Sequence, residues 1–270
     1  MLNPLVSVII RTFNRPKLLE QALESLRNQE MKNFEIIIVE DGVNTSYRLI
    51  EQFKDLDIKY FFFGMHMGRT RIGNYALSKS KGTYINFLDD DDFFFPSHLK
   101  SLTDAFYSFP NYGMIFSGSR EYQLKYISMN PLSYKVKKER ELYCNPVQKG
   151  DLFLKNMFPI QAVMFRRDMY EILGGFDENL TLLEDWDLWI RYSLQTEIGF
   201  VNEVTSVYTT PSNFFEKKKR KRRLAKYEEV ILMKHSGLIQ KKTKFYKIRE
   251  YYKSNGLRAT MKKILDVLKN

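Results

Sequence analysis

The sequence contains a single cysteine, Cys144, among its 270 residues. One thiol cannot form an intrachain disulfide, and it cannot supply a zinc cage or a CxxC redox pair. Long apolar runs are also missing. The N-terminal stretch MLNPLVSVIIRT has no basic segment and is too short in its apolar part for a signal peptide, and no later run approaches the ~20 residues of a membrane span. We therefore expect a cytoplasmic body.

Two common nucleotide-binding fingerprints are absent as well. There is no GxxxxGK[ST] loop, and no GxGxxG follows the first apolar run. These absences argue against a P-loop ATPase and against a dinucleotide-dependent enzyme.

Positive charge is scarce in most of the chain and concentrated at its end. Residues 211–270 carry 19 Lys and Arg against 5 Asp and Glu, a net charge of +14, whereas the whole chain has +11 and residues 1–210 therefore have −3. This division predicts a catalytic body, residues 1–210, followed by a basic helical extension, residues 211–270, with an anionic partner.

Short apolar runs alternate with stretches of helical periodicity in the first half of the chain. Such alternation predicts right-handed βαβ units and a mixed, mainly parallel sheet flanked by helices, an α/β fold. The expected strands are 5–10, 34–39, 58–63, 84–88 and 112–117, and the expected helices include 16–26, 46–54, one that begins at 96–97, and 182–191.

Four consecutive carboxylates, Asp89 to Asp92, follow the expected strand at 84–88. Adjacent anions repel one another, so a hard divalent cation with oxygen ligands, Mg²⁺ or Mn²⁺, would stabilise the cluster. The alternative is a solvated acidic turn. We favour the metal site, because ligands of open α/β sheets gather at the carboxyl ends of strands. Two other strands end in polar groups, at 12–15 and at 40–41, so three strand ends converge as in a nucleotide site.

Four segments together resemble family 2 glycosyltransferases with the GT-A fold. They are VSVIIRTFNRPKLL at 6–19, EIIIVEDG at 35–42, the stretch 71–74 with KGTYINFLDDDD at 81–92, and RRDMYEILGGFDENLTLLEDWDLWIR at 166–191. The resemblance implies an inverting hexosyltransferase that uses a nucleotide-diphosphate sugar, with a UDP-sugar as the first expectation. It also implies an acceptor hydroxyl on a saccharide or lipid-linked saccharide, in the synthesis of bacterial surface polysaccharide or other glycans.

The resemblance also implies roles for individual residues. The metal would bind Asp91 and Asp89 of a DxD motif, and Asp185 would be the general base, assisted by Glu184. The loop at 174–178 and the following helix would face the acceptor through Gly175, Phe176 and Trp186, with Trp189 as an alternative to Trp186. The expected donor-binding residues are Thr12, Asn14, Arg15, Glu40, Asp41, Arg71, Asn74, Asp89 and Asp90.

Two positions differ from the family pattern. Arg11 stands where proline is frequent, and Glu40 stands where aspartate is frequent. The usual Ala-Arg-Asn triplet is spread over residues 71–74, which leaves open whether Arg71 or Arg69 faces the donor phosphates.

We expect the body to consist of a half that binds the nucleotide sugar, residues 1–117, and a half that binds the acceptor, residues 118–210. Residues 118–160, rich in tyrosine and lysine, could form a hairpin, a mobile lid or an acceptor-side loop, of which we favour the last.

In the extension, KKKRKRR at 217–223 and an amphipathic stretch at 257–268 suggest docking on an anionic inner membrane leaflet. The alternative is simple packing of these helices on the body.

Two other functions are alternatives to a glycosyltransferase: a nucleotidyltransferase or sugar-nucleotide pyrophosphorylase, and a nucleic-acid-binding protein. The first lacks its glycine-rich N-terminal signature and the second conflicts with the acidic body, so no nucleic acid is expected as a partner.

Overall fold

The computed structural model describes residues 3–142 and 144–238. Its centre is a sheet with the strand order β3-β2-β1-β4-β8-β6-β9-β5, and β7 pairs with β6 at one side. The strands are β1 (Val6–Thr12), β2 (Phe34–Glu40), β3 (Ile58–Phe62), β4 (Tyr84–Asp89), β5 (Phe93–Phe94), β6 (Met114–Met129), β7 (Leu132–Leu142), β8 (Val163–Arg166) and β9 (Ile198–Pro211).

Strands β1 to β4 are parallel to one another, as the βαβ pattern predicts, and β6 and β9 are also parallel. Antiparallel pairing joins β8 to β4 and to β6. The sheet is therefore mixed, with the carboxyl ends of β1 to β4 at one edge, and the predicted α/β fold class is confirmed.

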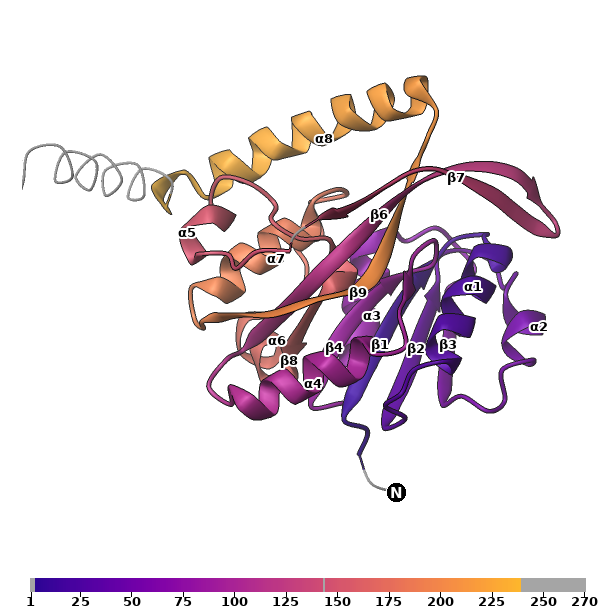
Figure 1. Ribbon diagram of the computed structural model, residues 1–270, viewed down its shortest axis with the longest axis horizontal. Coiled ribbons are helices and arrows are strands. Elements are labelled where there is room, and N and C mark those ends of the chain that lie inside the picture. The colour runs from indigo at the N-terminus through magenta and orange to yellow at the C-terminus, as the bar shows by residue number, and fades with distance from the viewer. Residues whose placement is uncertain (1–2, 143, 239–270) are drawn as a thin grey trace, which may run out of the picture.

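Helices cover both faces of the sheet (Figure 1). Every residue of β1 and β2 is buried, and alternate residues of each strand join two separate cores. The helices are α1 (Pro16–Arg27), α2 (Tyr47–Ile50), α3 (Arg69–Lys79), α4 (His98–Ser108), α5 (Lys149–Leu152), α6 (Arg167–Leu173), α7 (Glu184–Ser193) and α8 (Phe214–Lys234), with a 3₁₀ turn, η1 (Ile160–Ala162).

The two cores lie on opposite faces. Ile9 packs with residues of α3, α6 and α7 on one face, whereas Val8 and Ile10 pack with α1 and α4 on the other. Side chains alternate along a strand, so a strand that is covered on both faces needs apolar residues on both, and β1 has such a mainly apolar sequence.

The structure differs from the sequence-based expectation at two elements. The helix expected at 46–54 is the single turn α2, because the following N–H groups bond three residues back, Phe53 to Ile50 at 2.9 Å and Leu56 to Phe53 at 3.0 Å. The strand expected at 112–117 is the 16-residue β6, and the segment after it forms a hairpin with β7. Of the alternatives for residues 118–160, the structure shows a hairpin, formed by β6 and β7. The expected boundary between the two halves of the body, at 117–118, falls inside β6, at a register shift in the pairing of β6 with β9.

Helix α8 spans the upper side of the molecule in Figure 1. Near its start Lys217 donates to Gln123 of β6 at 2.5 Å, and at its end Lys234 and His235 contact Asp187 of α7 at 2.8 and 2.9 Å. Ile231 is fully buried. The first part of the extension thus packs on the body while exposing most of its basic residues. The amphipathic stretch expected at 257–268 lies outside the described residues.

None of the helices in the described part of the chain combines the length and apolarity that a membrane crossing requires.

Candidate active site

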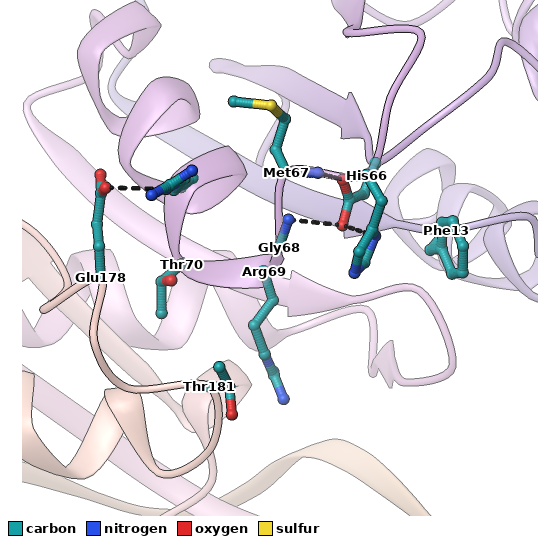
Figure 2. A pocket seen from close by; sticks show the side chains of 10 residues that line it. Phe13, His66, Met67, Gly68, Arg69, Thr70, Glu178 and Thr181 are labelled. Carbon is teal, nitrogen blue, oxygen red and sulfur yellow. Dashed lines mark hydrogen bonds and ion pairs between the residues drawn. The ribbon is translucent and has the colours of Figure 1, made fainter.

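A pocket of about 360 Å³ opens at the carboxyl edge of the parallel strands (Figure 2). It is formed by the residue after β1, the residue after β2, the loop and first turn of α3, and the loop before α7. The lining side chains and backbone belong to Phe13, Asp41, His66, Met67, Gly68, Arg69, Thr70, Arg71, Glu178 and Thr181.

Asp41 fixes the shape of this pocket. Its carboxylate accepts hydrogen bonds from the backbone N–H groups of Met67 at 2.6 Å and Gly68 at 3.1 Å, and it pairs with Nδ1 of His66 at 2.8 Å. Gly68 has φ +90°, a conformation that side-chain-bearing residues rarely adopt. Asp41 therefore holds the loop that leads into α3 and places Arg69 at the pocket wall.

Two arginines and two carboxylates form a closed cluster beneath the pocket. Asp89 accepts from Arg11 at 3.0 Å and from Arg69 at 3.3 Å, and Oε1 of Glu184 pairs with both arginines at 2.9 and 2.8 Å. We call these four residues the arginine–carboxylate quartet. Burial by itself would raise the pKa of Asp89, but Arg11 and Arg69 hold it below its usual value. The quartet joins the ends of β1 and β4 to the first turns of α3 and α7.

The remaining aspartates of the acidic turn have other partners. Asp90 accepts from the Thr12 hydroxyl at 2.7 Å and pairs with Arg15 at 2.7 Å. Arg15 also reaches Asp91 at 3.2 Å, and Asp92 accepts from the backbone N–H of Thr209 in β9 at 2.7 Å.

Burial and mutual repulsion affect how the acidic turn ionises. Burial, with a smaller contribution from the charge of Asp91, raises the pKa of Asp90 to about 7, although Arg15 favours the ionised form. Burial and then the charges of Asp91 and Asp89 raise the pKa of Asp92 well above its usual value. The pKa of Asp91 is also raised, first by burial and then by Asp89. Additional positive charge near the turn would lower these pKa values and allow all four carboxylates to be ionised together.

Asp185 lies in the first turn of α7, next to the quartet. Its side chain accepts from Asn156 at 3.1 Å and from the backbone N–H of Trp186 at 2.9 Å. Burial, and then the neighbouring Glu184 charge, raise its pKa to about 6, although Asn156 and Arg69 favour the ionised form. A carboxylate with a pKa near 6 is ionised at neutral pH and is still basic enough to accept a proton.

The sequence profile described as "Glycosyl transferase family 2" matches residues 7–172. The chain belongs to this family. An uncharacterized glycosyltransferase of Rickettsia bellii is 31% identical over 216 residues, 74% of this chain and 28% of that protein. A putative colanic acid biosynthesis glycosyl transferase, WcaA of Escherichia coli, is 24% identical over 98% of this chain and 94% of its own length.

Solved structures confirm the GT-A type of fold for this family 2 chain. A mannosyltransferase from Pyrobaculum calidifontis, in complex with GDP-Man and Mn²⁺, has a TM-score of 0.62 and 16% identity, with 99% of this chain and 81% of that chain covered. Staphylococcus aureus TarS in complex with UDP-GlcNAc has a TM-score of 0.60 at 17% identity, with 78% and 60% covered. The predicted glycosyltransferase class is confirmed at the level of the family. The chain spans only 28% of the Rickettsia bellii relative and 63% of a Rickettsia typhi relative.

Several expected donor-binding residues are engaged with the protein itself. Glu40 is fully buried and accepts from the hydroxyls of Thr45 and Tyr60 and from the N–H of Ser46. Asn74 binds both the N–H and the carbonyl of Phe176, at 2.7 and 3.0 Å. These two residues shape the loops around the pocket, and direct contact with a donor stays a prediction for them.

Thr12, Arg15 and Asp41 lie at the pocket or the acidic turn, as the sequence predicts. Asn14 has φ +53°, a conformation that asparagine tolerates, and Arg71 lines the pocket and pairs with Glu178 at 3.2 Å. Of the two candidates for the donor phosphates, Arg69 has the more central position, because it pairs with Glu184 at 2.8 Å and with Asp89 at 3.3 Å. The charges of Glu184, Asp89, Asp185 and Asp91 outweigh the effect of burial and raise its pKa above the usual value.

The expected acceptor platform is wrong. Trp186 is 1% exposed, and its indole N–H donates to the carbonyl of Leu152 at 2.5 Å, so its face cannot stack on a sugar. The alternative, Trp189, is fully buried, and Phe176 is buried against Arg11 and Phe87. The aromatic residues of this helix form core because the apolar stripe of α7 packs against the sheet.

Gly175 has a positioning role that the structure makes clear. A Cβ added there would meet Oδ1 of Asn74 at 2.3 Å, and its carbonyl accepts from Arg191 at 2.5 Å. The loop at 174–178 therefore lies tightly against α3 and α7, beside the pocket but without an exposed aromatic ring.

The carboxylates of the acidic turn are the candidates to hold Mn²⁺ or Mg²⁺. Within the described residues no three His, Cys, Asp or Glu side chains converge as a metal cage. Magnesium-like ions in nucleotide enzymes are commonly held by one or two carboxylates plus substrate phosphates, so such a cage is not required. Asp91 fits this role, since its side chain is one-third exposed and pairs with the exposed Arg15 at 3.2 Å. Asp89 fits less well than the sequence suggests, because each of its oxygens already accepts from an arginine.

Sequence reasoning missed several residues that the structure places at the site. Arg11 was noted only as a departure from the family pattern, and Asn156 and Thr209 come from segments far away in sequence. Phe13, His66 and Glu178 line the pocket. A charged residue within an apolar strand could have indicated the role of Arg11. The sequence around Asn156 and around Thr209 contains no comparable indication.

Proposed function

We propose that this chain transfers a sugar from a nucleotide-diphosphate sugar to a hydroxyl of a saccharide or lipid-linked saccharide, with inversion at the anomeric carbon. The observation that carries the proposal is the position of Arg69. Its side chain lines the pocket and pairs with Asp89 of the acidic turn and with Glu184, the residue before Asp185. A donor diphosphate bound at Arg69 would bring the anomeric carbon between the pocket and the expected base.

The reaction follows from this arrangement as a single displacement. Asp185 accepts the proton of the acceptor hydroxyl while that oxygen attacks the anomeric carbon from the face opposite the diphosphate. Arg69 stabilises the negative charge that develops on the leaving diphosphate. A bound Mn²⁺ or Mg²⁺, held through Asp91, would add Lewis-acid stabilisation of the same charge.

The nucleotide is expected in the pocket between Phe13 and the loop before α3. Phe13 is 45% exposed and lies 5.1 Å from the ring of His66, so an aromatic surface is available to a base. We take a UDP-sugar as the first donor to test, and a GDP-sugar as the second, since neighbours of this fold are described with UDP-GlcNAc and with GDP-Man. The E. coli relative named for colanic acid biosynthesis supports a role in bacterial surface polysaccharide synthesis.

We also propose that the enzyme works at the inner face of the cell membrane. The exposed basic residues of α8 at 218–223 follow two exposed phenylalanines, Phe214 and Phe215, which are 69% and 78% exposed. Each Lys or Arg near an anionic lipid surface contributes ~1 kcal/mol, and aromatic rings favour the interface. Peripheral attachment of this kind would bring a lipid-linked acceptor to the site.

The proposal is tested by incubating the purified chain with a panel of nucleotide sugars, with Mn²⁺ or Mg²⁺. Thermal stabilisation by one donor and slow release of the matching nucleoside diphosphate are expected, because water can replace a missing acceptor. If no donor shifts the melting temperature or is turned over, with or without anionic vesicles that carry lipid-linked saccharide, the proposed function is wrong.

A further inference from the structure

Arg11 is the less accessible of the two arginines in the arginine–carboxylate quartet. Its side chain is 4% exposed, and the guanidinium carbon lies 5.4 Å from the ring centre of Phe87 and 5.3 Å from that of Phe176. Both of its terminal nitrogens are used, one for Asp89 and one for Glu184. Arg11 is therefore held on two sides by rings and at its end by two carboxylates, and it does not line the pocket.

Arg69 binds the same two carboxylates but has a different environment. Its side chain is 39% exposed and lines the pocket. A phosphate ligand in the pocket would compete with Asp89 and Glu184 for this guanidinium, because all three are anionic partners of one fork. The quartet thus consists of a fixed arginine and an accessible one.

Glu184 transmits this difference to the expected base. It is the first residue of α7 and is 2% exposed, and Asp185 follows it directly. The residue before it, Leu183, has φ +58°, so the chain turns sharply into the helix at this point. A carboxylate anchored at the first position of α7 fixes both the start of the helix and the orientation of Asp185.

We propose that Arg11 is a positioning residue for sugar transfer, which holds Glu184, and with it Asp185, at a fixed distance from the acidic end of β4. This inference rests on the proposed function and adds a residue to it. When the donor diphosphate engages Arg69, Arg11 remains as the bridge between Asp89 and Glu184. Without Arg11 the two carboxylates compete with the donor for Arg69, and α7 loses its link to β4.

The test is a charge-balanced cycle of three variants, R11M, E184Q and R11M/E184Q, with melting temperature, kcat and donor KM measured for each. Each single variant leaves an uncompensated buried charge and should lower the melting temperature by at least about 6 °C. The double variant restores neutrality and should melt above both single variants. Its kcat should nevertheless stay at least about 30-fold below the parent value, because Asp185 is no longer fixed. The donor KM should change less than about 3-fold, since Arg69 is released to the donor.

A fourth variant, R11K, keeps the charge but cannot bridge two carboxylates with one fork. It should recover most of the stability and only part of kcat. As a matched control, K59M removes the cation from Glu35, a fully buried carboxylate near the amino-terminal end of β2. This change should lower the melting temperature without lowering kcat of the folded enzyme.

Three results would overturn the inference: parent-like kcat in R11K, recovery of kcat together with stability in the double variant, or a loss confined to donor KM. A parent that neither transfers nor hydrolyses any donor would instead remove the proposed function, and this inference with it. An active parent with unaffected variants would remove only the role of Arg11.

Discussion

Asp185→Asn is the sharpest test of the catalytic assignment, because the structure indicates that the fold will accommodate it. Asparagine has the same shape as aspartate and can still accept from the N–H of Trp186. On the other side, Oδ1 of Asn156 is buried and accepts no hydrogen bond from the part of the chain that the structure describes, so a flip of that amide would provide an acceptor for the new NH₂ group. Loss of activity in this variant would therefore report on the missing base rather than on unfolding.

The expected loss is at least ~100-fold in transfer, the lower end of the ~10² to 10⁴ that general-base catalysis contributes. Donor affinity should stay within about 3-fold, because the proposed donor contacts come from the pocket and from Arg69 rather than from Asp185. The assay combines initial rates of nucleoside diphosphate release in the presence of acceptor with donor titration by calorimetry. Comparable transfer rates in parent and variant would refute the assignment of the base.

The pH dependence gives a second measurement on the same residue. Burial raises the pKa of Asp185 to about 6, so the carboxylate is protonated and inactive below that pH and ionised above it. The parent kcat/KM should rise with pH through about 6, with about tenfold loss per unit on the acid side. Asn156→Ala removes a hydrogen bond to the ionised form and should move this limb upward by about one unit, since such a bond contributes about 1.5 kcal/mol. An unshifted limb in N156A, or an acid limb retained in D185N, would assign the titration to another group.

Three further predictions concern the acidic turn and α8. Asp91→Asn should weaken metal-dependent donor binding and lower the rate together, and full parent activity in excess EDTA would contradict a metal role. Asp187→Asn should release the end of α8 and speed hydrogen exchange over 227–238. Burial alone would raise the pKa of Asp187, but His235 and Lys234 outweigh it and lower the pKa. The Asp187 carboxylate is therefore ionised above about pH 4, and the contact with the end of α8 is lost only as the pH falls further. Equal exchange in parent and variant at pH 7 would show that the contact does not hold the helix. Replacing three lysines of α8 by Glu, at Lys218, Lys219 and Lys221, should reduce sedimentation with anionic liposomes at least about tenfold. The charge-matched control replaces three lysines of β7 by Glu, at Lys135, Lys137 and Lys138. Equal binding by both variants would contradict docking through α8.

The core of the nucleotide half was predictable because its strands are covered on both faces. A parallel strand that is covered on both faces is built mainly from apolar residues, and β1, β2 and β4 each have a mainly apolar run. The acidic turn was predictable for a similar reason, since four carboxylates at a strand end have few structural explanations.

The acceptor side was less accessible to sequence reasoning. Trp186 and Trp189 look the same in sequence whether they face a ligand or the core, and only packing against the sheet decides between these possibilities. The long β6–β7 hairpin has an alternation disturbed by two register shifts, which hides its period of two. Tertiary contacts such as Asn156 with Asp185 join segments 29 residues apart and leave no local pattern.

Thr209 connects the acidic turn to the strand that leads into α8. Its N–H donates to Asp92 at 2.7 Å and its hydroxyl donates to the carbonyl of Asp91 at 3.0 Å, two residues before β9 ends at Pro211. The family match ends at residue 172, before α7 and before β9. A fragment cut at the end of that match would lack the expected base and the backbone support of the expected metal ligand. The site therefore depends on residues at least as far as Thr209, well beyond the point where the family match ends.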